Sequence, residues 1–301
     1  MPVVHQNSSA VPFAFASPAD VEKLLSSVGY IADAAISSTV HLASQLGKPV
    51  LVEGPAGTGK TELAKSLSRA TGARLIRLQC YEGLDESKAL YEWDYRKQLL
   101  RIQAAQGSTD AGWDALEDDI FGEGYLLTRP LLEAIRADDD VILLIDEVDR
   151  LDIETEALLL EVLSDFQVSI PELGTITAPR RPLVLLTSNN SRELSEALKR
   201  RCLFLHVGYP SLEREREIVM TAVPDLPEVL ADRMTQVVRS LRELDLKKHP
   251  SVSETLDWAR ALLINDVSDL DTDTVVGNLS VLLKNQIDIE RATAELQGRP
   301  A

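Results

Sequence analysis

The chain has 301 residues, 45% of them hydrophobic, so it is long enough for one large domain, or a large and a small one, with a sizeable core. Its 48 acidic residues outnumber its 31 basic residues, and the net charge of −17 disfavours general binding to nucleic acid or to an anionic membrane. No apolar run approaches the roughly 18 residues of a membrane-spanning helix and residues 1–20 lack a signal-peptide pattern, so we expect a cytoplasmic protein without membrane insertion.

The N-terminal residues 1–18 are predicted to form a flexible arm. A helix is expected to begin near Ser17-Pro18, because serine caps helices and proline suits the first turn. A second helical stretch is expected at about 31–47. The two cysteines, Cys80 and Cys202, match no zinc-ligand spacing, so they are expected to be reduced thiols.

Short apolar runs bounded by turns or by helical periodicity predict five buried strands. They are Pro49–Val52, Leu75–Leu78, Val141–Ile145, Leu183–Thr187 and Leu203–Val207. Strands that alternate with helices indicate an α/β fold, with a parallel five-stranded sheet covered by helices on both faces. After Gly208-Tyr209-Pro210 only helical periodicity remains. We therefore expect an α/β domain over residues 19–209 and a small all-helical domain over residues 210–301.

A glycine-rich segment follows the first predicted strand and precedes a helix. It consists of Gly54, Pro55, Ala56, Gly57, Thr58, Gly59, Lys60 and Thr61, with Glu62 next in the chain. This is the P-loop pattern in its required context, and glycines let the backbone N–H groups turn toward phosphate. Lys60 supplies a mobile charge for the β- and γ-phosphates, and the Thr61 hydroxyl is a hard ligand for Mg²⁺. The sequence therefore predicts that this segment binds ATP and Mg²⁺.

Two carboxylates stand at the end of the third predicted strand. Asp146 and Glu147 follow the apolar run Val141–Ile145, at the carboxyl end where open α/β sheets bind ligands. Asp146 is predicted to hold Mg²⁺, and Glu147 to orient or deprotonate the water that attacks the γ-phosphate. A strand that merely ends in a polar loop is the alternative, which the preceding P-loop disfavours.

These motifs resemble the AAA+ ATPases and, among them, the MoxR family, over roughly residues 20–295. The resemblance places a sensor-one residue at the end of Leu183–Asn189, so it implies that Asn189 helps to position the attacking water. Capping of a helix over residues 191–199 is the alternative role for an asparagine here, and it suits the neighbouring Asn190 rather than Asn189. The family fold implied is an AAA+ domain followed by a helical lid domain.

The resemblance also implies an arginine that acts across a subunit interface. Arg201 matches the family's arginine finger best, and Arg200 is the second candidate. In such rings this residue stabilises charge on the γ-phosphate bound by the neighbouring subunit. Activity then requires a homo-oligomer, most often a hexamer. A salt-bridge pair on the surface is the alternative for these two arginines.

Two insertions favour the MoxR branch. The first covers about residues 82–105 and matches that branch's helix-2 insert in position. The second covers about residues 167–178, where strand formers flank Pro171–Gly174 and predict a β-hairpin at the family's presensor-one position. Both are expected to face the ring pore or a partner.

The lid departs from the family pattern at one position. Where the family usually carries a sensor-two arginine, the nearest matching residue is Glu254, and a carboxylate cannot stabilise phosphate charge. Lys247, Lys248 and Arg260 lie nearby as substitutes.

The finer resemblance is to the CoxD-like group of MoxR proteins. It is carried by Leu78–Asp85, Ala89–Tyr95 and Pro250–Trp258. It implies a chaperone or remodeller that assists maturation of a molybdenum hydroxylase such as carbon monoxide dehydrogenase, with a von Willebrand factor A domain protein as partner. For Tyr91, Trp93 and Tyr95, packing of a helix against the domain is the alternative.

Two other classes of function remain open. One is an AAA+ motor that acts on nucleic acid or on another protein complex, which the negative charge disfavours. The other is a nucleotide-binding module without turnover, which the intact Glu147 disfavours.

Overall fold

The computed structural model describes residues 13–105 and 120–298 of the chain. At its centre lies a five-stranded sheet in the order β2-β5-β8-β1-β9, in which every neighbouring pair is parallel. The strands are β1 (Val50–Glu53), β2 (Arg74–Gln79), β5 (Val141–Asp146), β8 (Leu183–Ser188) and β9 (Leu203–His206). All five predicted strands are confirmed, each to within one residue at its ends.

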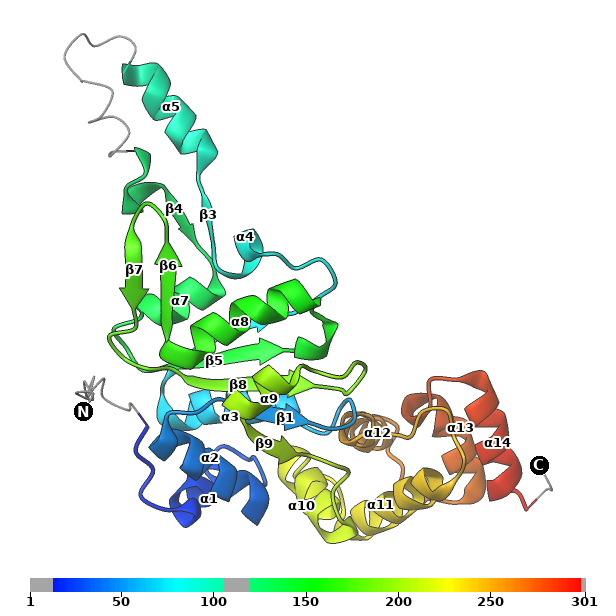
Figure 1. The fold of residues 1–301 in the computed structure, drawn as a ribbon. Coiled ribbons are helices and arrows are strands. Elements are labelled where there is room, and N and C mark those ends of the chain that lie inside the picture. Colours follow the sequence, from blue (N-terminus) through cyan, green and yellow to red (C-terminus); the bar gives the residue numbers. More distant parts are fainter. Residues whose placement is uncertain (1–12, 106–119, 299–301) are drawn as a thin grey trace.

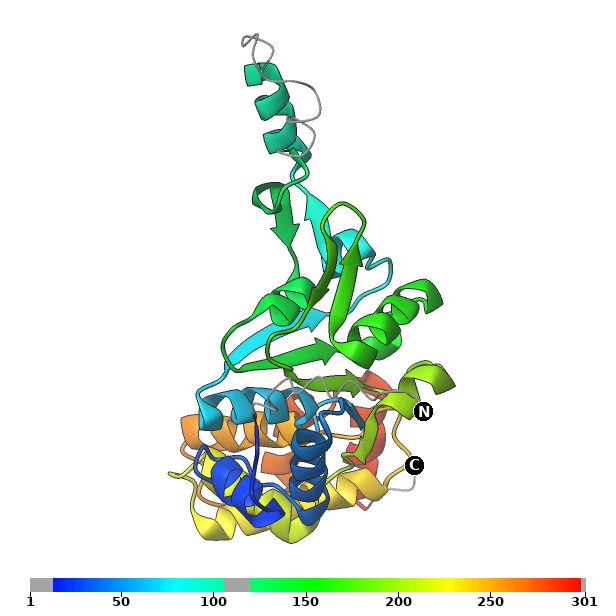
Figure 2. The ribbon, with the colours of Figure 1, turned by 60° about the vertical axis from the view of Figure 1, so that its left-hand side comes forward.

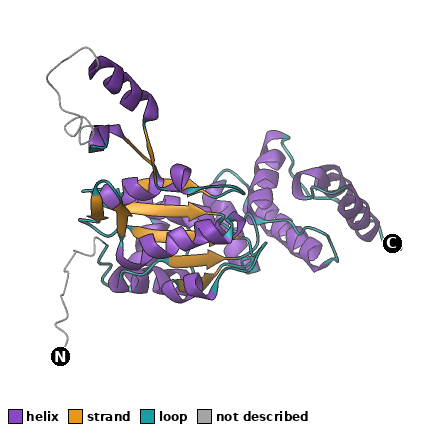
Figure 3. Cartoon of the chain, turned by 45° about the horizontal axis from the view of Figure 1, so that its top comes forward, coloured by secondary structure: helices purple, strands orange, loops and turns teal. Residues whose placement is uncertain are grey.

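Helices cover both faces of this sheet (Figures 1 and 3). On one face lie α1 (Pro18–Ser26), α2 (Ala34–Leu46) and α3 (Lys60–Thr71); on the other lie α7 (Pro130–Arg136), α8 (Ile153–Asp165) and α9 (Glu196–Arg201). Strand β5 serves both cores, because successive side chains point to opposite faces: Ile142 packs with the first set and Leu143 with the second. A strand buried on both sides needs a continuous apolar run, and the α/β prediction is confirmed.

Five helices follow the sheet and enclose a third hydrophobic cluster around the fully buried Trp258. They are α10 (Leu212–Ala222), α11 (Glu228–Glu243), α12 (Val252–Ile264), α13 (Thr272–Leu282) and α14 (Gln286–Leu296). In Figure 1 this helical unit, yellow to red and here named the lid, stands beside the loop that follows β1. None of the helices in the described ranges combines the length and apolar character needed to cross a membrane.

The insert at residues 82–105 contains a strand as well as two helices. It forms α4 (Glu86–Ala89), β3 (Tyr91–Trp93) and α5 (Tyr95–Ala105), and β3 pairs antiparallel with β4 (Leu126–Thr128). Packing of a helix is therefore the wrong account of Tyr91 and Trp93, which lie on one face of a strand with their rings edge to face at 6.4 Å. Aromatic residues at alternate positions favour a strand. Helix α5 projects from the body of the molecule (Figures 1 and 2).

The predicted hairpin is present as β6 (Gln167–Ile170) and β7 (Gly174–Thr177), which pair antiparallel. Val168 and Ile170 are buried in the core between the sheet and α8. One face of the hairpin thus packs against its own domain, and only the other face is available to a partner.

The N-terminal segment is ordered where the structure describes it. Residues 1–12 of the predicted flexible arm lie outside the described residues, but Phe13 is buried beneath α2, and Gln45 donates a hydrogen bond to the Phe15 carbonyl at 2.9 Å. Within residues 13–18, the rings of Phe13 and Phe15 stack at 6.2 Å between centroids and pack against the apolar cluster that includes α2. Helix α1 begins as predicted, with Ser17 as its N-cap and Pro18 in the first turn.

Candidate functional site

The P-loop joins the end of β1 to the start of α3. A Cβ at Gly54 would lie 2.0 Å from the carbonyl oxygen of Val207, so the close approach of β1 to the chain after β9 requires glycine. Gly59 immediately precedes α3 and no side chain caps that helix, so the loop leads directly onto free N–H groups at a helix N-terminus. This arrangement suits an anion.

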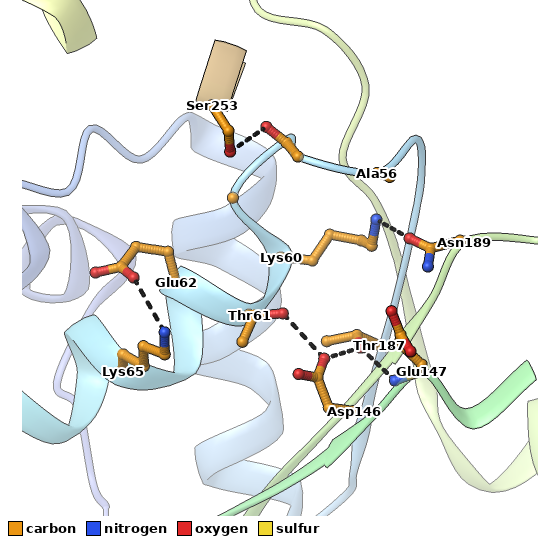
Figure 4. Close-up of a pocket in the computed structure, with 12 residues that line it drawn as sticks. Ala56, Lys60, Thr61, Glu62, Lys65, Asp146, Glu147, Thr187, Asn189 and Ser253 are labelled. Atoms are coloured by element: carbon orange, nitrogen blue, oxygen red, sulfur yellow. Dashed lines mark hydrogen bonds and ion pairs between the residues drawn. The ribbon is translucent and has the colours of Figure 1, made fainter. Parts of the chain in front are cut away.

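The Lys60 ammonium connects the P-loop to the end of β8. Its Nζ donates hydrogen bonds to the carbonyl oxygens of Gly54 and Pro55, both at 2.7 Å, and to Asn189 Oδ1 at 2.8 Å. Burial lowers the pKa of Lys60, while the nearby carboxylates of Asp149 and Asp146 oppose that shift. The sequence placed Lys60 and Asn189 in one site, and the structure brings them into contact (Figure 4).

Asp146 is 3% exposed, and both of its carboxylate oxygens accept hydrogen bonds. Its Oδ1 accepts hydrogen bonds from the hydroxyls of Thr61 at 2.9 Å and Thr187 at 2.5 Å, and its Oδ2 accepts from Arg77 Nη2 at 2.6 Å. The two predicted metal ligands, Thr61 and Asp146, thus lie side by side at the mouth of the P-loop. Hydroxyl and carboxylate oxygens are the donor set that Mg²⁺ prefers, so these residues fit the metal.

Glu147 is held in a strained conformation with φ of 59°, which is uncommon outside glycine and is often found at functional sites. Its backbone N–H donates to Thr187 Oγ1 at 2.9 Å. Its carboxylate Oε2 accepts from Gln79 Nε2 at 3.1 Å and pairs with Arg150 Nε at 3.0 Å. The other carboxylate oxygen, Oε1, receives no hydrogen bond from the described residues.

The sequence did not single out Arg77, Gln79, Arg150 or Thr187. Arg77 and Gln79 alternate along β2, and β2 pairs with β5 in a register that sets Gln79 opposite Asp146. Thr187 comes from β8 on the other side of β5. These residues could have been sought at the carboxyl ends of the strands beside β5, where Asp146 and Glu147 also lie.

The segment after β8 differs from the prediction. Helix α9 begins at Glu196 with Ser195 as its N-cap, so a helix over residues 191–199 capped by Asn190 is wrong. Buried Asp149 holds the intervening loop, because its Oδ2 accepts from the backbone N–H groups of Asn189 at 3.2 Å and Ser191 at 2.9 Å. The chain is held as a loop here, and the helix begins only at Glu196.

Arg200 and Arg201 line neither of the two cavities that meet at the P-loop. Arg201 donates to Ser164 Oγ at 2.5 Å and to the Ala197 carbonyl at 3.1 Å. Arg200 is exposed, and neither arginine forms an ion pair within residues 13–105 and 120–298. The surface salt-bridge alternative is therefore absent from this part of the chain.

Two adjoining cavities meet at the P-loop. The first, of about 280 Å³, is lined by Ala56, Gly57, Gly59, Lys60, Thr61, Glu62, Lys65, Asp146, Glu147, Thr187, Asn189 and Ser253 (Figure 4). The second, of about 410 Å³, shares Gly57, Gly59, Glu62 and Ser253 with the first and continues past Thr58 toward Gly29–Ile31 and the apolar lid residues Ile218 and Leu256. The sequence did not predict that Tyr30 and Ile31 would line this space.

Comparison with known proteins identifies the class. The model of the family described as ATPase family associated with various cellular activities (AAA) matches residues 50–209, just over half of the 301 residues. The chain belongs to this family of AAA ATPases, with a five-stranded parallel sheet, helices on both sides and a C-terminal helical unit.

Relatives with similar sequences come from staphylococci. An uncharacterized protein of Staphylococcus epidermidis is 26% identical over 238 residues, which cover 76% of this chain and 80% of the relative. Another from Staphylococcus saprophyticus is 26% identical over 250 residues, covering 80% and 84%. Among solved structures, a RuvB variant of Thermotoga maritima aligns with a TM-score of 0.47 and 18% identity, over 96% of this chain and 86% of that one.

Proposed function

We propose that this protein binds ATP with Mg²⁺ and hydrolyses it. The observation that carries the proposal is one cavity of about 280 Å³ into which Lys60, the Thr61–Asp146 pair and Glu147 all project. A cation, a hard oxygen pair and a carboxylate on one cavity wall are what phosphoryl transfer to water requires.

Each residue has a distinct task in this proposal. Lys60 exchanges its contacts with the Gly54 and Pro55 carbonyls for phosphate oxygens. Thr61 and Asp146 would hold Mg²⁺, which supplies charge stabilisation at the phosphates. Glu147 accepts a proton from the attacking water at Oε1, since Gln79 and Arg150 already hold Oε2.

Asn189 orients the attacking water. Its side chain already reaches Lys60 at the γ-phosphate end of the site, at 2.8 Å. The nucleoside extends into the second cavity, where Tyr30, Ile218 and Leu256 offer apolar surface to a base.

We further propose that the working form is a homo-oligomeric ring, most simply a hexamer. Among the described residues, the basic side chains that line the phosphate cavity are Lys60 and Lys65, and Lys65 pairs with Glu62 at 3.9 Å. Arg77 and Arg150 lie near but are paired with Asp146 and Glu147, so in this proposal a second cation for the transition state comes from another subunit. Arg201, or the exposed Arg200, is the candidate.

This ring can be tested by mixing inactive subunits. Arg201→Ala subunits retain the phosphate site, and Lys60→Ala subunits retain the arginine, so mixed rings are expected to recover part of the ATPase rate at interfaces where both are intact. Single-variant preparations serve as controls. Failure to recover any rate in rings shown to be mixed would remove Arg201 from the mechanism, and repeating the mixture with Arg200→Ala would test the second candidate.

The finer proposal is a MoxR-type, CoxD-like remodeller that helps to assemble the metal centre of a molybdenum hydroxylase such as carbon monoxide dehydrogenase, with a von Willebrand factor A domain protein as partner. It is supported by the sequence resemblance in Leu78–Asp85, Ala89–Tyr95 and Pro250–Trp258. The projecting helix α5 offers a surface outside the ATP site for such contacts. A ring ATPase acting on nucleic acid is the alternative, and the net charge of −17 disfavours it.

The decisive experiment measures phosphate release by the purified protein with ATP and Mg²⁺, with ATP and EDTA, and with added DNA. Turnover that needs Mg²⁺ and ignores DNA is the expected result. No turnover in any oligomeric state would contradict the ATPase proposal, and strong stimulation by DNA would favour the alternative. The metal content of a molybdenum hydroxylase from cells lacking this protein tests the client.

A further inference from the structure

The lid approaches the phosphate cavity through Ser253 rather than through Glu254. Ser253 is the one lid residue among those that line the first cavity. Glu254 is turned back onto its own helix, where its Oε2 accepts hydrogen bonds from the backbone N–H of Ser251 at 2.9 Å and from the Ser251 hydroxyl. The residue that the resemblance aligned with the sensor-two position is thus a capping residue of α12.

The basic residues on α12 and just before it do not take the place of the missing sensor-two arginine. Lys248 Nζ pairs with Glu254 Oε1 at 3.6 Å, and Arg260 Nη1 pairs with Asp257 at 3.0 Å. Arg260 lines the second cavity, and Lys247 lines neither cavity. Within the described residues, the lid therefore contributes a hydroxyl but no cation to its own phosphate site.

Ser253 contacts the P-loop itself. Its backbone N–H and its hydroxyl both donate to the carbonyl oxygen of Gly57, at 3.3 and 3.5 Å (Figure 4). Gly57 has φ of 74°, and a Cβ there would lie 2.2 Å from the hydroxyl oxygen of Ser251. The first turn of α12 thus rests directly on the P-loop at a point where only glycine fits.

The same turn of α12 is tied to the rest of the lid by buried charges. The Thr255 hydroxyl donates to Glu215 Oε1 at 2.9 Å, and Glu215 forms a two-bond ion pair with Arg242 at 2.6 and 2.7 Å. Arg242 also donates to the Pro250 carbonyl at 2.8 Å and stacks over Tyr209, with 4.6 Å to the ring centroid. Tyr209 lies where the chain passes from the sheet to the lid. A displacement of α12 would therefore be transmitted to that crossing.

From these contacts we infer that Ser253 is a positioning residue, which couples the state of the P-loop to the orientation of the lid through the Gly57 carbonyl. The inference rests on nucleotide binding at the P-loop, as proposed above. A γ-phosphate draws Lys60 away from the Gly54 and Pro55 carbonyls, and the loop that carries Gly57 adjusts with it. Ser253 follows Gly57, and Thr255 with Glu215 carries the movement into the lid.

The test compares the affinities of ATP and ADP in Ser253 variants. Ser253→Ala is expected to lower the ratio of ATP to ADP affinity roughly 2- to 10-fold, the usual worth of one hydrogen bond. Ser253→Thr keeps the hydroxyl and is expected to restore the wild-type ratio. Ser240→Ala, on the exposed face of α11, is the matched control.

Hydrogen exchange supplies a second readout, which a merely structural role would not move. In the wild-type protein, ATP is expected to slow exchange at the amides of residues 253–256 more than ADP does, and Ser253→Ala should erase that difference while its unfolding midpoint stays unchanged. If wild-type protein binds neither nucleotide, the proposed function itself fails. If it binds both and Ser253→Ala leaves the affinity ratio and the exchange pattern unchanged, the coupling inference is overturned.

Discussion

The lid and the phosphate site both hold buried charges, and they satisfy them in different ways. In the lid, Glu215 and Arg242 pair through two short bonds, the Thr255 hydroxyl donates to Glu215, and Arg242 Nε donates to the Pro250 carbonyl. At the phosphate site, Lys60 is held by two backbone carbonyls and one amide oxygen. The lid pair is bonded within the lid, and we expect its disruption to destabilise the fold. The site holds its charges in contacts that a ligand can replace.

The sharpest way to test this difference is to remove a site charge and follow both rate and stability. Glu147→Gln is expected to keep ATP binding and the unfolding midpoint, while hydrolysis falls roughly 10²- to 10⁴-fold, the worth of a positioned base. Phosphate release and chemical denaturation of the same preparation measure both quantities. Glu161→Gln, on the exposed side of α8, is the matched control. A variant that turned over normally would take Glu147 out of the chemistry.

In the lid, removing a charge is expected to lower the stability of the protein. Glu215→Ala leaves the buried guanidinium of Arg242 without its carboxylate, so the free energy of unfolding should fall by about 3–5 kcal/mol. Urea denaturation followed by tryptophan fluorescence, to which the fully buried Trp258 of the lid contributes, measures it. Glu243→Ala removes an exposed carboxylate from α11 and provides the comparison. A loss no greater than that of the control would mean that the pair does not stabilise the lid.

A smaller change probes the link between the pair and α12. Thr255→Val keeps nearly the same shape but removes the hydroxyl that donates to Glu215, so we expect a loss of about 1.5–3 kcal/mol in unfolding free energy, the range for a hydrogen bond to a charged group. Combining it with Glu215→Ala should give less than the sum of the two losses, because the residues are in contact. Strict additivity would show that the hydroxyl acts elsewhere.

Local patterns in the sequence predicted the strands of the central sheet and part of the candidate site. Apolar runs predicted each strand, and the motif Gly54–Thr61 with Asp146 and Glu147 lies around one cavity. Arg77 and Thr187 could not be predicted, because each reaches Asp146 from a neighbouring strand and sheet order is set by contacts far apart in the chain. Tyr30 was missed for the same reason, since it lines its cavity with lid residues that lie far along the chain.

In the lid, the residue aligned with the sensor-two position and the residue that reaches the P-loop are neighbours in the chain. Neighbouring residues on an α-helix point about 100° apart, because one turn takes 3.6 residues. The resemblance aligned Glu254 with the family's sensor-two position as a departure from the pattern, and the side chain that faces the P-loop is that of its neighbour Ser253. Asn190 is a similar case: a good capping residue by type, it precedes a loop that Asp149 holds open, and Ser195 caps the helix instead.

The three acceptors of Lys60 also have a consequence for selectivity. An ammonium that already donates to three oxygens gains little by exchanging them for the oxygens of a small free anion, because the bonds lost offset the bonds formed. Inorganic phosphate or sulfate should therefore compete weakly at this site. In the proposed binding mode a nucleotide would differ, since its base and ribose would reach the adjoining cavity of about 410 Å³ and add contacts there. In a cell rich in phosphate, a lysine whose hydrogen bonds are already satisfied would thus favour the larger ligand at the P-loop.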